Sequence, residues 1–262
     1  MRAAVSGCGP ELHKHQRSYV IVHMGNVSVA EAASRLGVHV SRIHQRIAEG
    51  SLRAERIGAQ WVVDELSLLH VAERSAPGRP LSARSAWALI AAAERDDEAL
   101  VELEPFARAR ARDRLEELLA LAAAPPNAEA DVRRIASALR SLFRNRALRE
   151  LRKAASADLP RLREDVRWKS LVRAAVSGIA SPDVEGYLAA IDVKPLSEEF
   201  LLMPADSDAN VILHVLPEGQ KAYPESKLLL AADLAEHWGP REELRAAELV
   251  REVAEDHEAV ER

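Results

Sequence analysis

The sequence predicts a mainly α-helical protein that ends in a small α/β domain. Aromatic residues are only 4% and charged residues 29% of its 262 residues, with many Ala, Leu, Arg and Glu. This mix favours helices over an all-strand fold. Helical apolar patterns recur along the chain, whereas FLLMP (200–204) and NVILHVLP (210–217) have the character of strands.

The chain is 48% hydrophobic, which is enough to bury a sizeable core. Its 262 residues are long for one compact helical domain, so the sequence predicts two or three domains. Residues 1–25 are expected to be a flexible extension, or translation starts near Met24. Residues 26–74 form the first predicted domain, and SAPGRPLS (75–82) is a linker by composition. A helical region is expected at 83–157, followed by a C-terminal α/β domain at 158–262 that binds a partner.

The first helix is predicted from its end signals. Ser28 can cap a helix that runs to Leu36, and Glu31 completes a capping box. Gly37 then provides a left-handed stop. The apolar face of this helix is expected to consist of Ala30, Ala33 and Leu36.

A second helix is predicted from His39 or Val40 to Glu49, and Gly50 ends it. A short hairpin follows, with strands at 52–57 and 60–63 around Gly58-Ala59. Asp64 then caps a helix at 65–73. The apolar stripe of the second helix is expected to be Val40, Ile43 and Ile47.

Two helices around a glycine turn, followed by a hairpin, are typical of a winged helix-turn-helix, whose second helix enters the DNA major groove. Arginine and glutamine on that helix can form bidentate hydrogen bonds to guanine and adenine. Arginines on the hairpin can reach phosphates or the minor groove, and Trp61 is expected to fix the hairpin to the helices. The predicted DNA-binding residues are Ser28, His39, Ser41, Arg42, His44, Gln45, Arg46, Arg53, Arg56 and Gln60.

The same stretch resembles the excisionase-type winged helix-turn-helix, which is related to the DNA-binding domain of MerR regulators. One position departs from this pattern: His39 stands where the family usually has Ser or Thr to cap the recognition helix. The resemblance implies DNA binding. The residues that match the family pattern are Ser28-Val29, Glu31-Ala32-Ala33, Leu36-Gly37-Val38, Ile43, Ile47, Gly50, Leu52, Ala54, Arg56-Ile57-Gly58, Trp61 and Val63.

A helix-turn-helix can also serve only to bind protein or to dimerise. Residues 24–74 carry six Lys/Arg and six Asp/Glu, so this domain has little general attraction for phosphate. A single copy should therefore bind DNA weakly. A homodimer or a second basic surface would be needed for useful affinity.

Later helices are predicted at 83–93, 105–123 and 129–155, with Pro125-Pro126 separating the last two. LREDVRWKSLVRAAV (162–176) is expected to be a helix and SGIASPD (177–183) a turn. A final helical part covers residues 226–260 and breaks at Gly239-Pro240.

Charge is distributed unevenly along the second half of the chain. Residues 125–175 hold 13 Lys/Arg against 6 Asp/Glu, and residues 176–262 hold 7 against 19. This asymmetry suggests a middle that faces a polyanion and an end that meets a basic partner, although solvated helix faces give the same pattern. The basic helix expected at 131–154 can contact nucleic acid or an acidic surface, including the chain's own C-terminal region. Its cations are Arg133, Arg134, Arg140, Arg144, Arg146, Arg149, Arg152 and Lys153.

A second resemblance extends over the rest of the chain. GRPLSARSAWALIAA (78–92), NVILHVLP and LLLAADLAEHWGPREELRAAELV resemble, in texture and order, the type IV abortive-infection (AbiE-like) antitoxins of actinobacteria. The resemblance implies a repressor of its own operon that neutralises a nucleotidyltransferase-like toxin encoded nearby. The acidic C-terminal domain would then meet the basic surface of the toxin.

No catalytic, metal-binding or cofactor-binding motif is recognisable, so we expect no enzyme, no metal site and no cofactor. Cys8 is the single cysteine, and the histidines lack metal-ligand spacing. The chain has no run of eighteen apolar residues and no signal peptide, so a cytoplasmic location without membrane contact is expected.

The leading hypothesis is therefore a DNA-binding repressor that acts as the antitoxin of a toxin–antitoxin pair, with double-stranded operator DNA and a toxin as partners. The alternative is a stand-alone regulator of MerR or excisionase type. An excisionase-like factor that bends DNA comes third, because such factors usually lack a tail of this length.

Overall fold

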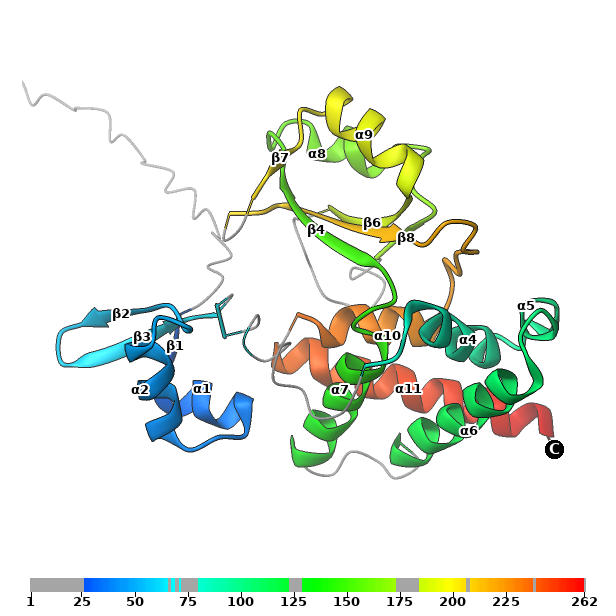
Figure 1. The fold of residues 1–262 in the computed structure, drawn as a ribbon, viewed down its shortest axis with the longest axis horizontal. Coiled ribbons are helices and arrows are strands. Elements are labelled where there is room, and N and C mark those ends of the chain that lie inside the picture. Colours follow the sequence, from blue (N-terminus) through cyan, green and yellow to red (C-terminus); the bar gives the residue numbers. More distant parts are fainter. Residues whose placement is uncertain are drawn as a thin grey trace, which may run out of the picture.

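The chain forms an N-terminal unit and a larger α/β unit in the computed structural model (Figure 1). The structure describes residues 26–65, 67, 68, 71, 80–122, 129–172, 184–205, 208–237 and 239–261. The predicted extension, residues 75–79 of the linker and the turn at 177–183 lie outside these ranges. Within them, no helix is both long enough and apolar enough to cross a membrane.

The N-terminal unit combines two helices with a three-stranded antiparallel sheet of order β1-β3-β2. Its first strand was not predicted and pairs with the hairpin. The elements are β1 (Asn26–Ser28), α1 (Val29–Leu36), α2 (Val40–Ala48), β2 (Ala54–Ile57) and β3 (Gln60–Asp64). They enclose a hydrophobic cluster of their own that includes Val27, Ala33, Ile43, Leu52 and Val63.

Local signals explain these boundaries. The Ser28 hydroxyl accepts a hydrogen bond from the N–H of Glu31 at 3.1 Å and so caps α1. Gly37 ends the helix with φ 62°, a left-handed conformation that favours glycine. The Glu31 carboxylate, predicted to complete the capping box, accepts a hydrogen bond from Arg35 at 2.9 Å. Ala30 is exposed, since α1 turns Ala32 toward the sheet instead.

The larger unit has a helical layer below a five-stranded sheet and two helices above it (Figure 1). One hydrophobic cluster joins side chains of α4, α6, α7, α10 and α11 with Tyr187 and Leu216 of the sheet. This core crosses residue 157, where the sequence predicts a boundary. The helices of this layer are α4 (Ala83–Ala93), α5 (Asp97–Val101), α6 (Pro105–Ala122), α7 (Glu129–Phe143), α10 (Lys227–Ala235) and α11 (Pro240–Glu261).

The sheet has the order β5-β6-β8-β4-β7, in which β6 and β8 are parallel and the other pairs antiparallel. Its upper face carries a second cluster, formed with α8 and α9 around Leu162, Leu196 and Phe200. The elements are β4 (Leu148–Lys153), α8 (Leu159–Arg163), β5 (Ser170–Leu171), β6 (Val184–Ala189), α9 (Ala190–Glu199), β7 (Met203–Pro204) and β8 (Val211–Leu216).

The protein is therefore mixed α/β rather than mainly α-helical. The prediction of fold class was wrong mostly because of the segment 144–172, where strands replace predicted helix. The helix predicted over 129–155 ends at Phe143, and the chain returns as β4, which pairs with β8. The helix predicted at 162–176 is replaced within its described residues by the end of α8 and by β5. Of the strand predicted at 200–204 only Met203–Pro204 is extended, because Phe200 still closes α9.

Candidate nucleic-acid interface

The outer face of α2 brings together most of the polar side chains that the sequence predicts for base contact. His39, Ser41, Arg42, His44 and Gln45 are all exposed. Ile43, between them in sequence, is fully buried and fixes the rotation of the helix. The predicted inner stripe is only partly correct, because Val40 is 38% exposed. Arg46, predicted to point outward, is half-buried at the end of the helix.

Three side chains along this face form a hydrogen-bonded row. Arg42 donates through Nη1 to Oε1 of Gln45 at 2.6 Å. Gln45 in turn donates through Nε2 to Oε1 of Glu49 at 2.7 Å. Glu49 was not among the predicted site residues; it holds Gln45, which in turn holds Arg42. The row engages the side-chain oxygen and one amide hydrogen of Gln45, whereas Arg42 keeps further N–H donors for contacts to bases.

His39 caps the N-terminus of α2. Its Nδ1 accepts a hydrogen bond from the N–H of Ser41 at 3.3 Å and lies 3.0 Å from the Ser41 hydroxyl. The helix therefore begins at Val40. Because His39 and Ser41 are bonded to each other at this end, their first role in the free protein is to fix the start of α2.

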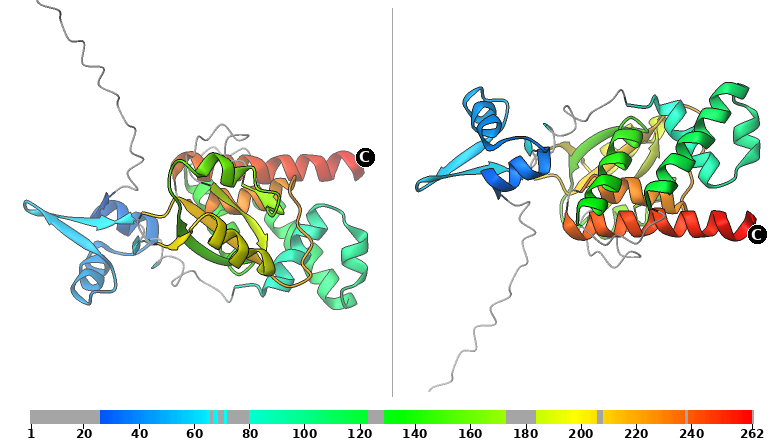
Figure 2. Two further views of the ribbon diagram at one scale, coloured as in Figure 1. Left: turned by 90° about the horizontal axis from the view of Figure 1, so that it is seen from above. Right: turned by 90° about the horizontal axis from the view of Figure 1, so that it is seen from below.

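The hairpin projects beyond the two helices (Figures 1 and 2). Arg53, Arg56 and Gln60 on it are exposed, as the sequence predicts. Arg53 lies at its base, where its N–H donates to the Ser67 hydroxyl at 2.7 Å. Arg56 lies nearer the tip, opposite the half-buried Trp61. The two arginines are thus spread along the hairpin, as contacts to successive phosphates would require.

Ser28 is exposed, but its hydroxyl is engaged as the cap of α1. The geometry therefore brings Arg42, His44 and Gln45 together on α2, with Arg53, Arg56 and Gln60 on the neighbouring hairpin. Ser28, His39 and Ser41 have structural roles at helix ends. Backbone N–H groups at such helix ends also suit phosphate binding.

Replacing Glu49 by glutamine should raise the affinity for DNA of any sequence. The change removes a negative charge beside Arg42 and Gln45 while keeping a group that can accept the Gln45 hydrogen bond. We expect a gain of about 0.5–1 kcal/mol at low salt. Fluorescence anisotropy with a random duplex measures it. Glu218→Gln, exposed in the larger unit after β8, is the matched control for net charge, and an equal gain in both variants would contradict a local role for Glu49.

The basic segment at 131–154 does not form one cationic face. Arg146 is buried, and Arg140 pairs with Glu243 at 3.0 Å. In β4, Arg152 pairs with Glu150 on its own strand at 2.5 Å. The arginines of this segment therefore do not make the second basic surface that the sequence suggests. Some lie on α7, others lie on β4, and Arg146 is buried in an ion pair.

Arg146 is the centre of a buried polar cluster between the sheet and α10. Its guanidinium donates to Asp233 at 2.7 Å and to the Tyr187 hydroxyl at 2.6 Å, and it also pairs with Glu236. Burial alone would lower the pKa of Arg146. The neighbouring carboxylates outweigh this effect and hold its pKa well above the ordinary value for arginine. Burial raises the pKa of Asp233, whereas Arg146 lowers the pKa of Glu236.

A second buried group lies beside the first. The Glu185 carboxylate is 2.7 Å from Nε2 of His214 and 2.7 Å from Nε2 of His237. His214 also stacks on Tyr187, with ring centroids 4.7 Å apart. Although burial opposes ionisation, the two histidines hold the pKa of Glu185 well below its usual range. Within the described ranges, no cluster of histidine, cysteine or carboxylate side chains is arranged to hold a metal ion.

The stability of the protein should fall between pH 6.5 and about 9. The Glu185 carboxylate raises the pKa of His237 to about 9 from an ordinary 6.5. A group whose pKa is higher in the folded than in the unfolded state stabilises the fold fully at a pH below its unfolded-state pKa. This stabilisation is lost as the pH rises through the folded-state pKa. Urea unfolding at pH 6, 7.5 and 9.5 measures this loss. His237→Gln should flatten the dependence, and an unchanged slope in that variant would assign the effect to another group.

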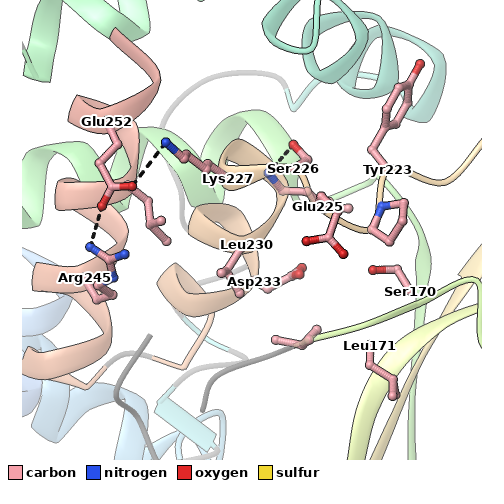
Figure 3. Close-up of a pocket in the computed structure, with 14 residues that line it drawn as sticks. Ser170, Leu171, Tyr223, Glu225, Ser226, Lys227, Leu230, Asp233, Arg245 and Glu252 are labelled. Atoms are coloured by element: carbon pink, nitrogen blue, oxygen red, sulfur yellow. Dashed lines mark hydrogen bonds and ion pairs between the residues drawn. The ribbon is translucent and has the colours of Figure 1, made fainter. Parts of the chain in front are cut away.

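A pocket of about 200 Å³ lies beside the buried cluster, between β5, α10 and α11. Figure 3 shows Asp233, Glu225 and Ser170 converging on it from different elements. On its other side, Lys227 and Arg245 pair with Glu252, at 3.4 Å and 2.8 Å. The pocket thus mixes both signs of charge. Its polar groups come from positions with no common sequence motif.

Comparison of the chain with protein-family models, with curated proteins and with solved structures gives no match.

Proposed function

We propose that the chain is a sequence-specific DNA-binding transcriptional repressor that acts in the cytoplasm and has no catalytic role. The observation that carries this proposal is the exposed face of α2 with Arg42 and Gln45, next to a projecting hairpin with Arg53 and Arg56. An α-helix fits the major groove, where arginine and glutamine distinguish guanine and adenine. The hairpin arginines suit the flanking phosphates.

A gel-shift experiment tests this proposal with the full chain. One duplex carries the DNA upstream of its own coding sequence, and the other is a scrambled duplex of the same length. We expect the upstream DNA to bind at least about a thousandfold more tightly at physiological salt, as specific regulators do. Equal affinity for both duplexes would contradict a role as a sequence-specific repressor. Because the charges of residues 24–74 balance, we expect two copies on a two-part operator.

We further propose that this repressor is an antitoxin. The similarity of its segments, in composition and order, to abortive-infection antitoxins supports this role. In this role the protein represses its own operon and neutralises a nucleotidyltransferase-like toxin encoded nearby. Colony counts test it when the neighbouring gene is expressed alone and then together with this chain. Toxicity that co-expression relieves supports the role, and a harmless neighbour rules it out.

A stand-alone regulator of MerR or excisionase type is the second candidate. The observation in its favour is that residues 80–261 contain hollows large enough for a small effector, such as one of about 530 Å³ between α5, α6 and α11. In this case the gel shift succeeds, the neighbouring gene is harmless, and an effector changes the affinity for DNA.

A further inference from the structure

A groove of about 440 Å³ lies between the start of α4 and the first half of α6. Its apolar side chains include Leu103 and Ala107. Arg84 of α4 and Arg110 and Arg114 of α6 line the same groove. Its size lies in the range of small-molecule sites, which combine apolar walls with a few polar groups.

The charge of this groove distinguishes it from two other hollows of the larger unit. Its lining contains the three arginines and no carboxylate. By contrast, the pocket beside Asp233 is also lined by Glu225 and Glu252, and a hollow at the end of α11 by Asp97 and Glu116.

Arg84, Arg110 and Arg114 form no ion pair with any residue that the structure describes. Three cations that share one groove without counter-charges repel each other, and an anion between them would relieve this repulsion. Arginine binds phosphate in particular, because its planar fork can donate two parallel hydrogen bonds. The first turn of α4, which also lines the groove, adds its partial positive charge.

One side of the groove carries an exposed aromatic ring. Phe106 is 71% exposed, and the Arg110 guanidinium lies 5.3 Å from the centre of its ring. An exposed phenyl ring buries little apolar surface in the free protein and so contributes little to its stability. A planar ligand ring could stack on Phe106. A ligand that combines phosphate with an aromatic ring therefore matches both halves of the groove.

We propose that the groove between α4 and α6 binds a phosphate-bearing small molecule with an aromatic ring, of the nucleotide class. Arg84 and Arg114 hold the phosphates, and Phe106 with Arg110 contacts the ring. This site is separate from the α2 face, and its occupancy can be measured without DNA. The inference therefore does not depend on the proposed function.

Isothermal titration of the full chain with ATP, with inorganic tripolyphosphate and with hexaglutamate tests the proposal, all in magnesium-free buffer. We expect ATP to bind most tightly, tripolyphosphate more weakly, and hexaglutamate weakest. The double variant Arg84→Gln/Arg114→Gln should lower the affinity for ATP and for tripolyphosphate by about tenfold or more. Phe106→Ala should lower the affinity for ATP to that of tripolyphosphate and leave tripolyphosphate unchanged.

Arg112→Gln is the matched control, because Arg112 lies on the same helix but lines the other hollow, 3.8 Å from Asp97. It should bind all three probes as the unchanged protein does. Circular dichroism checks folding, and the exposed single variant Arg84→Gln serves if the double variant unfolds. The proposal is overturned if neither phosphate probe binds at millimolar concentration, if Arg112→Gln loses as much affinity as the double variant, or if hexaglutamate binds as tightly as ATP.

Discussion

Replacing Arg146 by alanine is expected to lower the free energy of unfolding by about 3–5 kcal/mol. Arg146 is 1% exposed and is the cation that contacts both Asp233 and Glu236. Without it, the buried Asp233 carboxylate keeps only the Tyr187 hydroxyl as a partner, and the largely buried Glu236 carboxylate loses its pairing cation. Urea unfolding at pH 7, followed by circular dichroism, measures the loss.

Arg134→Ala is the control for this experiment, because Arg134 is exposed on α7 and the change should cost less than about 0.5 kcal/mol. Adding Asp233→Asn to Arg146→Ala should recover part of the loss, since one buried charge disappears. A loss below about 1 kcal/mol for Arg146→Ala alone would mean that the carboxylates reach water or another cation, and that the cluster does not stabilise the sheet against α10.

Replacing Arg42 by alanine should relax the preference for one base pair of the operator by about 1–3 kcal/mol. Gln45→Ala should act in the same way at a neighbouring base pair. Both side chains are exposed on α2 and belong to the hydrogen-bonded row that ends at Glu49. Competition binding against operators with single base changes measures the effect.

Arg56→Ala gives the contrasting pattern, because a phosphate contact carries no direct sequence information. It should weaken binding to all duplexes alike and reduce the salt dependence by about one unit of slope. If Arg42→Ala lowered affinity equally for operator and random DNA, the assignment of α2 as the base-contacting helix would be wrong.

The N-terminal unit could be predicted in detail because its signals are local. Ser28 and Gly37 mark the two ends of α1 within nine residues, and Gly58, at φ 62°, marks the hairpin turn. These residues act through their own backbone conformation or through partners three residues away. β1 was missed because three residues carry too little pattern, and its place depends on β3, far along the chain.

The sheet could not be predicted to the same extent, because its strands are defined by their partners. LRELRK in β4 has the composition of a helix, yet five of its residues pair with β8, from Leu148 opposite Val215 to Arg152 opposite Val211. Such long-range pairing overrides local propensity. β8, by contrast, is apolar except for His214, and the sequence predicts a strand at 210–217.

The buried clusters left almost no signal in the sequence. Glu185, His214 and His237 are spread over more than fifty residues and meet only after β6, β8 and α10 have assembled. A histidine inside the apolar strand NVILHVLP is the one hint, because a polar side chain there must find a buried partner. The groove between α4 and α6 likewise depends on how Arg84 packs beside a later helix.

Selection from a random duplex library tests whether α2 reads the DNA sequence. The full chain and the double variant Arg42→Ala/Gln45→Ala are carried through the same rounds at physiological salt, and the recovered DNA is sequenced. We expect the unchanged chain to enrich one motif and the double variant to lose preference at neighbouring positions within it. Enrichment of the same motif by both proteins, or of none by the unchanged chain, would contradict DNA recognition through α2.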